Sequence, residues 1–546
     1  MAAKYPSRHT VLGVLFGLCV TLTVITMLLE ASDEISFKTP AISVATLKLK
    51  QSPSNGSVIE KKNTTGPLPM SVTSHTKTNV QLISPRGHIQ VGDIIKYRIQ
   101  TRDSEGRDRV IGGDFWFATL NSKNPLASTA GYVADYNNGT YEVTLLAAWA
   151  GQAEFKLILV HPSEAVDYFK NVVWPAKERV QWNGYFNHKG KKAERTTCFL
   201  RSGGPWTGLC QYPAHHALGK TILVCRKPNG LSCDDFTSYN TDWNKCNQRL
   251  AELTKGVEYI FKGPNFMQPV RIEKNKKIQI DAGFLPPLND LPRCLPDQEI
   301  PAVQGYWLRG KWHSMLCRIP DFPKDMLHKC LRDKKVILHG DSTIGQWYKD
   351  FNSVLKADNP KASSNVRGHL KPVQTIYRSL NLTVAYYFHP ERVGSDIYGR
   401  KDMKYEVDVL DKLTTLDCQT YIIVLSPWSH FTVWTSESFI ERTALIRNAV
   451  LRLRKRCPNI LIVIKGPHPR HFPHISSPLL FSDFLAKEII GNTLRDGFKG
   501  TGAFYLPLWD MNLAHPAMNS VHMPHAVIVQ ELKMFLGYVC DNLATV

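Results

Sequence analysis

The sequence lacks the features that mark several large classes of protein. Of its 546 residues 43% are hydrophobic, yet only one long uncharged hydrophobic run occurs, at Val11–Leu29, so a polytopic membrane protein is excluded. It has no CxxC pair, no Walker A motif, no HExxH motif and no EF-hand loop. Because these motifs hold zinc, nucleotides or calcium, the sequence gives no ground to expect a metal or a nucleotide cofactor.

Acidic residues are scarce relative to basic ones. The chain has 47 Asp and Glu against 67 Lys and Arg, which gives a formal net charge of +20. Such an excess suggests an anionic partner, and nucleic acid, an anionic membrane and an acidic glycan all meet that description. Composition alone does not choose among the three.

The single hydrophobic run, Val11–Leu29, is long enough to cross a membrane. Its 19 residues span roughly 28 Å as a helix with ~1.5 Å rise per residue, close to the thickness of a bilayer core. Lys4 and Arg8 precede the run and Glu30 follows it, so the positive-inside rule keeps residues 1–10 in the cytosol and translocates the rest. We expect an uncleaved type II signal anchor. The alternative is a cleaved signal peptide, for which the residues after the run form a poor cleavage site.

A translocated chain should carry glycosylation sequons and oxidised cysteines, and this sequence offers both. Eleven of the twelve cysteines lie after the run, so we expect mostly structural disulfides, with one cysteine left free or paired between chains. The protein is then expected in the secretory pathway, at the Golgi or cell surface if anchored, or secreted if cleaved. Nucleic acid is excluded as a partner there, and the basic excess indicates an acidic glycan or a membrane. The acceptor asparagines are Asn55, Asn63, Asn138 and Asn381.

Two segments before residue 166 differ sharply in pattern. Residues 30–76 are rich in Ser, Thr, Lys and Pro and lack an apolar period, which is typical of a flexible glycosylated stem. Within residues 77–165, apolar and polar residues alternate at Asp93–Gln100, Gly139–Leu146 and Ala153–Val160, with turn residues between the runs. Short strands with this spacing predict a β-sandwich.

Residues 166–300 contain six of the cysteines and show weak periodicity. The six run from Cys198 to Cys294, among many Gly, Pro and Asn residues. This composition predicts a disulfide-stapled, loop-rich extension rather than a second hydrophobic core.

Residues 301–546 alternate between strand-like and helix-like segments. Buried strands followed by amphipathic helices predict a parallel, doubly wound α/β sheet, in which ligands bind beyond the carboxyl ends of the strands. The expected strands are Lys335–His339, Thr383–Phe388, Tyr421–Leu425, Ile460–Ile464 and Ala503–Leu506, and the expected helices cover about 344–355, 439–455, 479–490 and 526–538.

The tripeptide Gly340-Asp341-Ser342 follows the first of these strands. At the entrance to a helix, the Ser342 hydroxyl can face the crevice as a nucleophile, and the first N–H groups of the helix can stabilise an oxyanion. Gly340 would allow a tight turn and a close approach of substrate, and Asp341 would accept hydrogen bonds from neighbouring loops or cap the helix. The alternative is that Asp-Ser is only a helix N-cap.

A nucleophilic serine needs a base, and the loop after the last strand offers His522. This loop leads into the closing helix, so the topology places it on the same edge of the sheet as Ser342. His515 and His525, from the same stretch of chain, are expected to be surface or packing residues.

Two further loops carry polar residues. Ser429 and His430 follow a predicted strand and are candidates for lining the site. His468, His471 and His474 invite a metal interpretation, but the intervening prolines spoil helical ligand spacing. We therefore expect a packed or solvated loop there, and no metal site.

Several of these residues together resemble known families. Gly340-Asp341-Ser342 with a histidine before the last helix resembles the SGNH/GDSL esterase class. Upstream, Asp135–Val143 resembles the closing hairpin of filamin-type immunoglobulin-like repeats. A filamin-like sandwich, a Cys-rich segment and an esterase-like domain, in this order, resemble the neurexophilin and PC-esterase domain (NXPE) family over roughly residues 35–546. The stretches similar to the PC-esterase branch are Gly305-Tyr-Trp307 with Trp312 and Cys317, His339-Gly-Asp-Ser-Thr-Ile-Gly-Gln-Trp347, and Asn519-Ser-Val-His522.

The NXPE resemblance implies acyl-ester chemistry on extracellular glycans, with Ser342 as nucleophile and His522 as base. It implies an O-acyltransferase or esterase without a bound cofactor, with acetyl-CoA or another acyl donor if the enzyme transfers. O-acetylation of sialic acid is one implied activity, and the substrate is then an acidic or sialylated glycan or glycoprotein. Transfer and hydrolysis both remain open.

The chain departs from the SGNH pattern in two places. SGNH enzymes usually carry Asp three residues before the histidine, where this chain has Asn519. Asp510 is then an alternative partner for His522, and a Ser–His dyad is another. The expected oxyanion donors are the Ser342 N–H and the loop that holds Ser429. These departures keep open a second hypothesis, a catalytically silent neurexophilin-like ligand or adhesion protein.

Overall fold

The computed structural model describes residues 72–358, 360–362, 372–470, 479–516 and 521–543. The predicted anchor at 11–29 and most of the predicted stem lie outside these ranges, as do Asn55, Asn63 and Asn519. Among the helices of the described ranges, none is both long and apolar enough to cross a membrane.

Two sheets near the N-terminus of the described chain share one apolar core. The alternating segments predicted as strands form β3, β7 and β8, and in β3 the side chains of Ile95, Tyr97 and Ile99 are fully buried. The rings of Tyr97 and Phe155, one from each sheet, stack 4.0 Å apart. One sheet has the order β1 (Asn79–Ser84), β3 (Ile94–Gln100), β7 (Thr140–Leu146), β6 (Tyr132–Asp135).

The facing sheet recruits strands from later in the chain. β15 (Lys277–Asp281) pairs with β8 (Gly151–His161), and β16 (Gly305–Leu308) pairs with β5 (Leu126–Ala130), although the sequence had placed both later strands in other segments. Its order is β17 (Lys311–Ser314), β16 (Gly305–Leu308), β5 (Leu126–Ala130), β4 (Phe115–Lys123), β8 (Gly151–His161), β15 (Lys277–Asp281), β2 (Ile89–Gln90).

The segment 166–300, predicted as a disulfide-stapled, loop-rich extension, contributes five strands of a six-stranded antiparallel sheet, and the sixth, β22, comes from Tyr398–Gly399. Two disulfides staple this sheet as predicted, but its strands contradict the loop-rich part of the prediction. Its strands bury aromatic residues such as Trp182, Phe186 and Phe236. The polar–apolar alternation is weak because strands such as β10 are half-exposed on both faces and are separated by Gly, Pro and Asn turns. The order is β11 (Leu209–Tyr212), β12 (Ile222–Arg226), β10 (Glu194–Arg201), β9 (Gln181–Phe186), β13 (Phe236–Thr241), β22 (Tyr398–Gly399).

The C-terminal sheet contains every strand expected from residue 335 onward. Its parallel strands, taken in chain order, lie in the spatial order 2-1-3-4-5, an arrangement typical of doubly wound sheets. These strands are β21 (Leu382–Phe388), β18 (Lys335–Gly340), β23 (Tyr421–Ser426), β24 (Leu461–Lys465) and β25 (Phe504–Leu506), with antiparallel β20 (Val373–Tyr377) and β19 (Lys361–Ala362) beyond β21.

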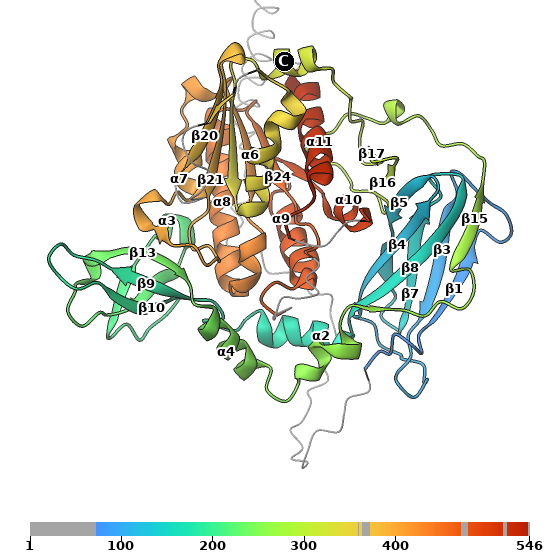
Figure 1. The fold of residues 1–546 in the computed structure, drawn as a ribbon, viewed down its shortest axis with the longest axis horizontal. Coiled ribbons are helices and arrows are strands. Elements are labelled where there is room, and N and C mark those ends of the chain that lie inside the picture. The colour runs from blue at the N-terminus through green and yellow to red at the C-terminus, as the bar shows by residue number, and fades with distance from the viewer. Residues whose placement is uncertain (1–71, 359, 363–371, 471–478, 517–520, 544–546) are drawn as a thin grey trace, which may run out of the picture. The chain divides into compact units, whose positions relative to one another are not determined.

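Helices lie beside the strands of this sheet (Figure 1). The helix expected at 479–490 covers Leu485–Gly491 in π geometry and continues into α9, and part of the expected loop before the last helix forms the short helix α10. The helices are α5 (Lys324–Leu331), α6 (Ser342–Leu355), α7 (Glu406–Lys412), α8 (Ser436–Arg456), α9 (Asn492–Gly497), α10 (Trp509–Ala514) and α11 (His525–Leu543).

Five disulfides form among the eleven cysteines after the hydrophobic run, and one thiol remains, as expected. Cys246 is buried, and burial raises the pKa of its thiol to about 11. The pairs are Cys198–Cys225, Cys210–Cys233, Cys294–Cys317, Cys330–Cys540 and Cys418–Cys457.

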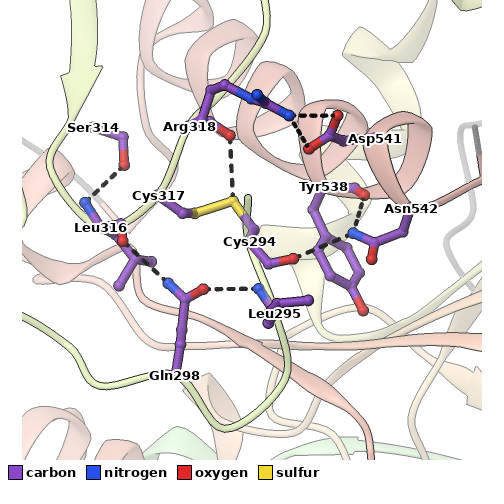
Figure 2. The surroundings of a disulfide bond; sticks show 10 residues. All are labelled: Cys294, Leu295, Gln298, Ser314, Leu316, Cys317, Arg318, Tyr538, Asp541 and Asn542. Atoms are coloured by element: carbon purple, nitrogen blue, oxygen red, sulfur yellow. Dashed lines mark hydrogen bonds and ion pairs between the residues drawn. A yellow bond between two sulfur atoms is a disulfide. The ribbon is translucent and has the colours of Figure 1, made fainter. Parts of the chain in front are cut away.

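The Cys294–Cys317 disulfide is part of a contact with the last helix (Figure 2). Arg318 Nη2 lies 3.1 and 3.2 Å from the two carboxylate oxygens of Asp541 on α11. Asn542 Nδ2 donates to the Cys294 carbonyl at 3.3 Å. The chain that enters the C-terminal domain is therefore fastened to α11.

Candidate active site

Ser342 is the first residue of α6, directly after the central strand β18. Asp341 is the N-cap: its Oδ1 accepts the Thr343 N–H at 2.8 Å, and its Oδ2 accepts the Ser429 N–H at 2.9 Å. Asp341 thus caps the helix and also binds a neighbouring loop. It is fully buried, and this burial raises the pKa of its carboxyl.

Gly340 is required by packing between strands. A Cβ added at this position would lie 2.6 Å from the Ser426 carbonyl oxygen and 2.8 Å from the Ser426 Cβ. Any larger residue would push β18 away from β23, which pairs with it at this point. Close contact with β23 therefore explains Gly340, where the sequence had suggested close approach of a substrate.

Ser342 and His522 are in hydrogen-bond contact. The Ser342 Oγ lies 2.8 Å from the His522 Nε2. Partial burial lowers the pKa of His522, and the charge of Lys349 lowers it further, while the Asp341 carboxylate opposes both effects. At neutral pH the ring is then mostly unprotonated, which is the state a general base requires.

The residues on both sides of His522 are held by Gln346, which the sequence did not single out, and by His468, which it indicated only as a loop residue. Gln346 on α6 donates its Nε2 to the Met523 carbonyl at 2.8 Å, and its Oε1 accepts the Met523 N–H at 3.1 Å. His468 contributes the other contact, from its Nε2 to the Val521 carbonyl at 2.9 Å. The one available signal for Gln346 was its place one helical turn after Ser342, on the same face of α6.

His468 belongs to the histidine-rich loop and is a buried, packed residue. Its ring meets that of Trp428 edge-on at 4.8 Å, and burial lowers its pKa well below the usual value. His471 and His474 lie outside the described residues. Within the described ranges, no group of three or more His, Cys, Asp or Glu side chains is arranged to hold a metal ion.

A cavity of about 620 Å³ opens beside Ser342 and His522. Ser429 and His430 lie in its lining, as do Lys349, Arg392 and Arg470, which the sequence did not indicate. The Arg470 guanidinium is fully buried and donates to the Ser429 carbonyl at 2.9 Å, so it fixes the loop that also carries His430. Arg392 stacks on the rings of Phe388 and Tyr398, at 4.0 and 3.3 Å from their centroids.

Of the two candidate partners of His522, Asp510 and Asn519, the structure describes Asp510. Asp510 is on α10, where burial raises the pKa of its carboxyl to about 6, and it is not among the described residues that line the cavity. Asn519 lies outside the described residues. His515 packs edge-on against Trp307 at 4.8 Å, and His525 lies 3.1 Å from an Asp350 carboxylate oxygen.

Two of the four sequons can be located. Asn138 is exposed in the turn between β6 and β7, where its Oδ1 accepts hydrogen bonds from the Thr140 N–H and hydroxyl. Asn381 is exposed in the turn before β21.

The comparisons with known families cover both halves of the chain. Residues 51–254 match the family model described as Neurexophilin. Residues 312–540, which include Ser342 and His522, match the model described as NXPE family member 4-like, C-terminal domain. Neurexophilin-type sequence together with five disulfides is typical of a secreted or secretory-pathway protein. The two matches follow one another along one chain, and the protein belongs to the NXPE family.

Proposed function

We propose that this chain is a serine-dependent O-acyltransferase or esterase of the SGNH/PC-esterase class that acts on cell-surface or secreted glycoconjugates. One observation carries the proposal: the Ser342 Oγ lies 2.8 Å from the His522 Nε2 beside a cavity of about 620 Å³. The place of Ser342, at the carboxyl end of the central strand of a 2-1-3-4-5 sheet, is where ligands bind in such sheets.

In the first half of the reaction, Ser342 takes the acyl group. Its Oγ attacks the carbonyl carbon of an acyl ester or thioester while the His522 Nε2 removes the hydroxyl proton. The Ser342 N–H, in the first turn of α6, stabilises the oxyanion that forms. His522 then gives its proton to the departing oxygen or sulfur atom, and the acyl group remains on Ser342.

In the second half, an acceptor removes the acyl group. A sugar hydroxyl or a water molecule loses its proton to His522 and attacks the acyl carbon. The bond between that carbon and the Ser342 Oγ then breaks, and His522 returns the proton to the Oγ. With a sugar hydroxyl as acceptor the enzyme is a transferase, which takes the acyl group from acetyl-CoA or another acyl donor. With water as acceptor it is an esterase. Lys349 and Arg392 in the cavity lining support an acidic glycan, such as a sialylated one, as substrate.

The cellular setting of this proposal follows from the sequence. The run 11–29 holds the chain in the membrane as a single-pass type II protein of the Golgi or cell surface, unless cleavage releases it. In either case the catalytic domain lies on the side where glycans are displayed.

One observation favours a catalytically silent ligand or adhesion protein as the second candidate. The Ser429 N–H, an expected oxyanion donor, is hydrogen-bonded to Asp341 instead. An enzyme with a single backbone donor stabilises the oxyanion less well, since loss of one such donor costs roughly 10²–10³ in rate.

The test compares O-acetylation of cell-surface glycans in cells that express the wild-type chain or Ser342→Ala at matched levels. The matched control is Ser353→Ala, which removes a hydroxyl from the same helix at a position that does not line the cavity. The proposal predicts that glycan O-acetylation changes when the wild type or Ser353→Ala is expressed and does not change when Ser342→Ala is expressed. Equal levels in all three would support the silent protein.

A further inference from the structure

The ring of His430, which lines the cavity, is hydrogen-bonded to the ring of His389. The His389 Nε2 lies 2.9 Å from the His430 Nδ1, and both side chains are at least nine-tenths buried. The other nitrogen of His389, Nδ1, lies 2.8 Å from the Pro390 carbonyl oxygen. This chain of contacts fixes where the protons are.

The Pro390 carbonyl can only accept, so the His389 Nδ1 carries a hydrogen and donates it. His389 is neutral, because burial and the neighbouring His430 hold its pKa well below the usual value. Its Nε2 is therefore an acceptor, and the His430 Nδ1 must donate to it. The Val393 N–H also approaches the His430 Nδ1, but at 3.5 Å it is too distant to compete.

His430 is neutral for the same reason, since burial and the charges of Arg392 and Arg470 lower its pKa. With its one hydrogen on Nδ1, its Nε2 is an unprotonated acceptor. That atom has no hydrogen-bond partner within the described ranges, and His430 lines the cavity. The ring lies nearly parallel to that of Phe388, with 5.7 Å between centroids and 18° between planes, which limits its rotation.

We propose that the His430 Nε2 accepts a hydrogen bond from a free hydroxyl group of the substrate and so positions a polyhydroxylated sugar against Ser342. This inference rests on the proposed function and narrows it. A neutral acceptor favours an O–H group and disfavours a carboxylate or carbonyl oxygen at the same place. His430 is thus a positioning residue.

The first experiment measures binding, so that it does not depend on turnover. The ligands are an O-acetylated methyl hexoside with free hydroxyls and its counterpart with those hydroxyls methylated, titrated into the Ser342→Ala protein. The free-hydroxyl sugar should bind about tenfold more tightly, as expected for one satisfied hydrogen bond. In Ser342→Ala combined with His430→Phe, which keeps a ring to pack on Phe388, that preference should vanish.

A second variant and a spectrum complete the test. His430→Gln places an amide oxygen near the position of Nε2 and should restore part of the preference. Long-range ¹H–¹⁵N spectra of the histidine rings should show the Nδ1-protonated form of His430 in the wild type. A preference that survives His430→Phe, equal binding of both sugars to the parent protein, or an Nε2-protonated His430 would overturn the inference.

The proposed function fails differently. Absence of acyl transfer and hydrolysis by a wild-type protein that still prefers the free-hydroxyl sugar would refute catalysis and leave the hydroxyl-binding site in place. The control for loss of a buried histidine is His161→Gln, which removes a ring that packs among Phe169, Phe261 and Phe266 and does not line the cavity. It should keep the full preference.

Discussion

The N-terminal sandwich and the C-terminal α/β domain both bury polar side chains, but they use them in opposite ways. In the sandwich, the Asp114 carboxylate accepts hydrogen bonds from the Thr73 hydroxyl, the Ser163 N–H and the Tyr141 hydroxyl. The C-terminal domain instead brings Ser342 and His430 to the wall of a cavity of about 620 Å³.

The contrast separates a structural polar cluster from a chemical one. A buried carboxylate that accepts hydrogen bonds from several neighbouring donors serves the fold, because those bonds offset the cost of its burial. An acceptor or nucleophile that faces an open cavity can still bind a ligand, and a cluster of such groups with shifted pKa values indicates a functional site. The first kind should change stability when mutated, and the second should change activity.

The largest expected effect is on catalysis, from His522→Gln. Removing the base should lower kcat by about 10³-fold or more, since Ser342 then has no group to take its proton. Thermal unfolding should be nearly unchanged, because the ring is partly open to solvent. If His522→Gln kept the wild-type kcat, the polar residues of the C-terminal domain would no longer differ in role from those of the sandwich.

Gln346→Ala should have the next largest effect on rate. It removes both hydrogen bonds to Met523, so that His522 is held less firmly against Ser342. We expect kcat to fall about 10- to 100-fold with little change in KM. Gln346→Glu can still accept a hydrogen bond from the Met523 N–H but cannot donate one to the Met523 carbonyl. Its kcat should therefore lie between those of the wild type and the alanine variant. Equal kcat for all three would show that the clamp does not position the base.

Mutation of the polar cluster in the sandwich should change stability and leave activity unchanged. Tyr141→Phe removes a donor from the Asp114 carboxylate and an acceptor from the Asp114 N–H. The expected loss is about 1–3 kcal/mol in the free energy of unfolding, measured by chemical denaturation, with kcat and KM unchanged. A fall in kcat at full stability would contradict the structural role assigned to this cluster.

The pH profile should give the smallest and most specific effect. Because only the unprotonated His522 acts as base, activity should rise with pH through the pKa of this ring. That pKa is lowered from the usual 6.5, so the acid limb of kcat/KM should lie below pH 6.5. Asp341→Asn removes a negative charge that raises the pKa of His522, so the limb should move to still lower pH. A limb that moves upward would contradict the assignment of the base.

The sequence predicted best what depends on strand order. Carboxyl ends of parallel strands meet at one edge of a sheet, so a serine after β18 and a histidine before α11 could be expected to lie close together. The alternation of strands and helices behind this inference can be read from short stretches of sequence, and each expected strand of the C-terminal sheet is present.

What failed depended on contacts between distant segments. The pairing of β16 with β5 has no local signature, and neither has the packing of Ser426 against Gly340. The same holds for Arg470, whose side chain reaches the Ser429 loop only in the folded chain. The short helix α10 that carries Asp510 was likewise expected to be part of a loop.

The most direct test of the central claim is a search for an acyl group on Ser342. The purified wild-type protein, Ser342→Ala and Ser353→Ala are each incubated briefly with an activated aryl acetate, quenched in acid, digested and analysed by peptide mass spectrometry. We expect one acetyl group on Ser342 in the wild type and in Ser353→Ala, and no acetylated α6 peptide in Ser342→Ala. An unmodified Ser342 in the wild type, under conditions where the ester reaches the cavity, would contradict a covalent acyl enzyme.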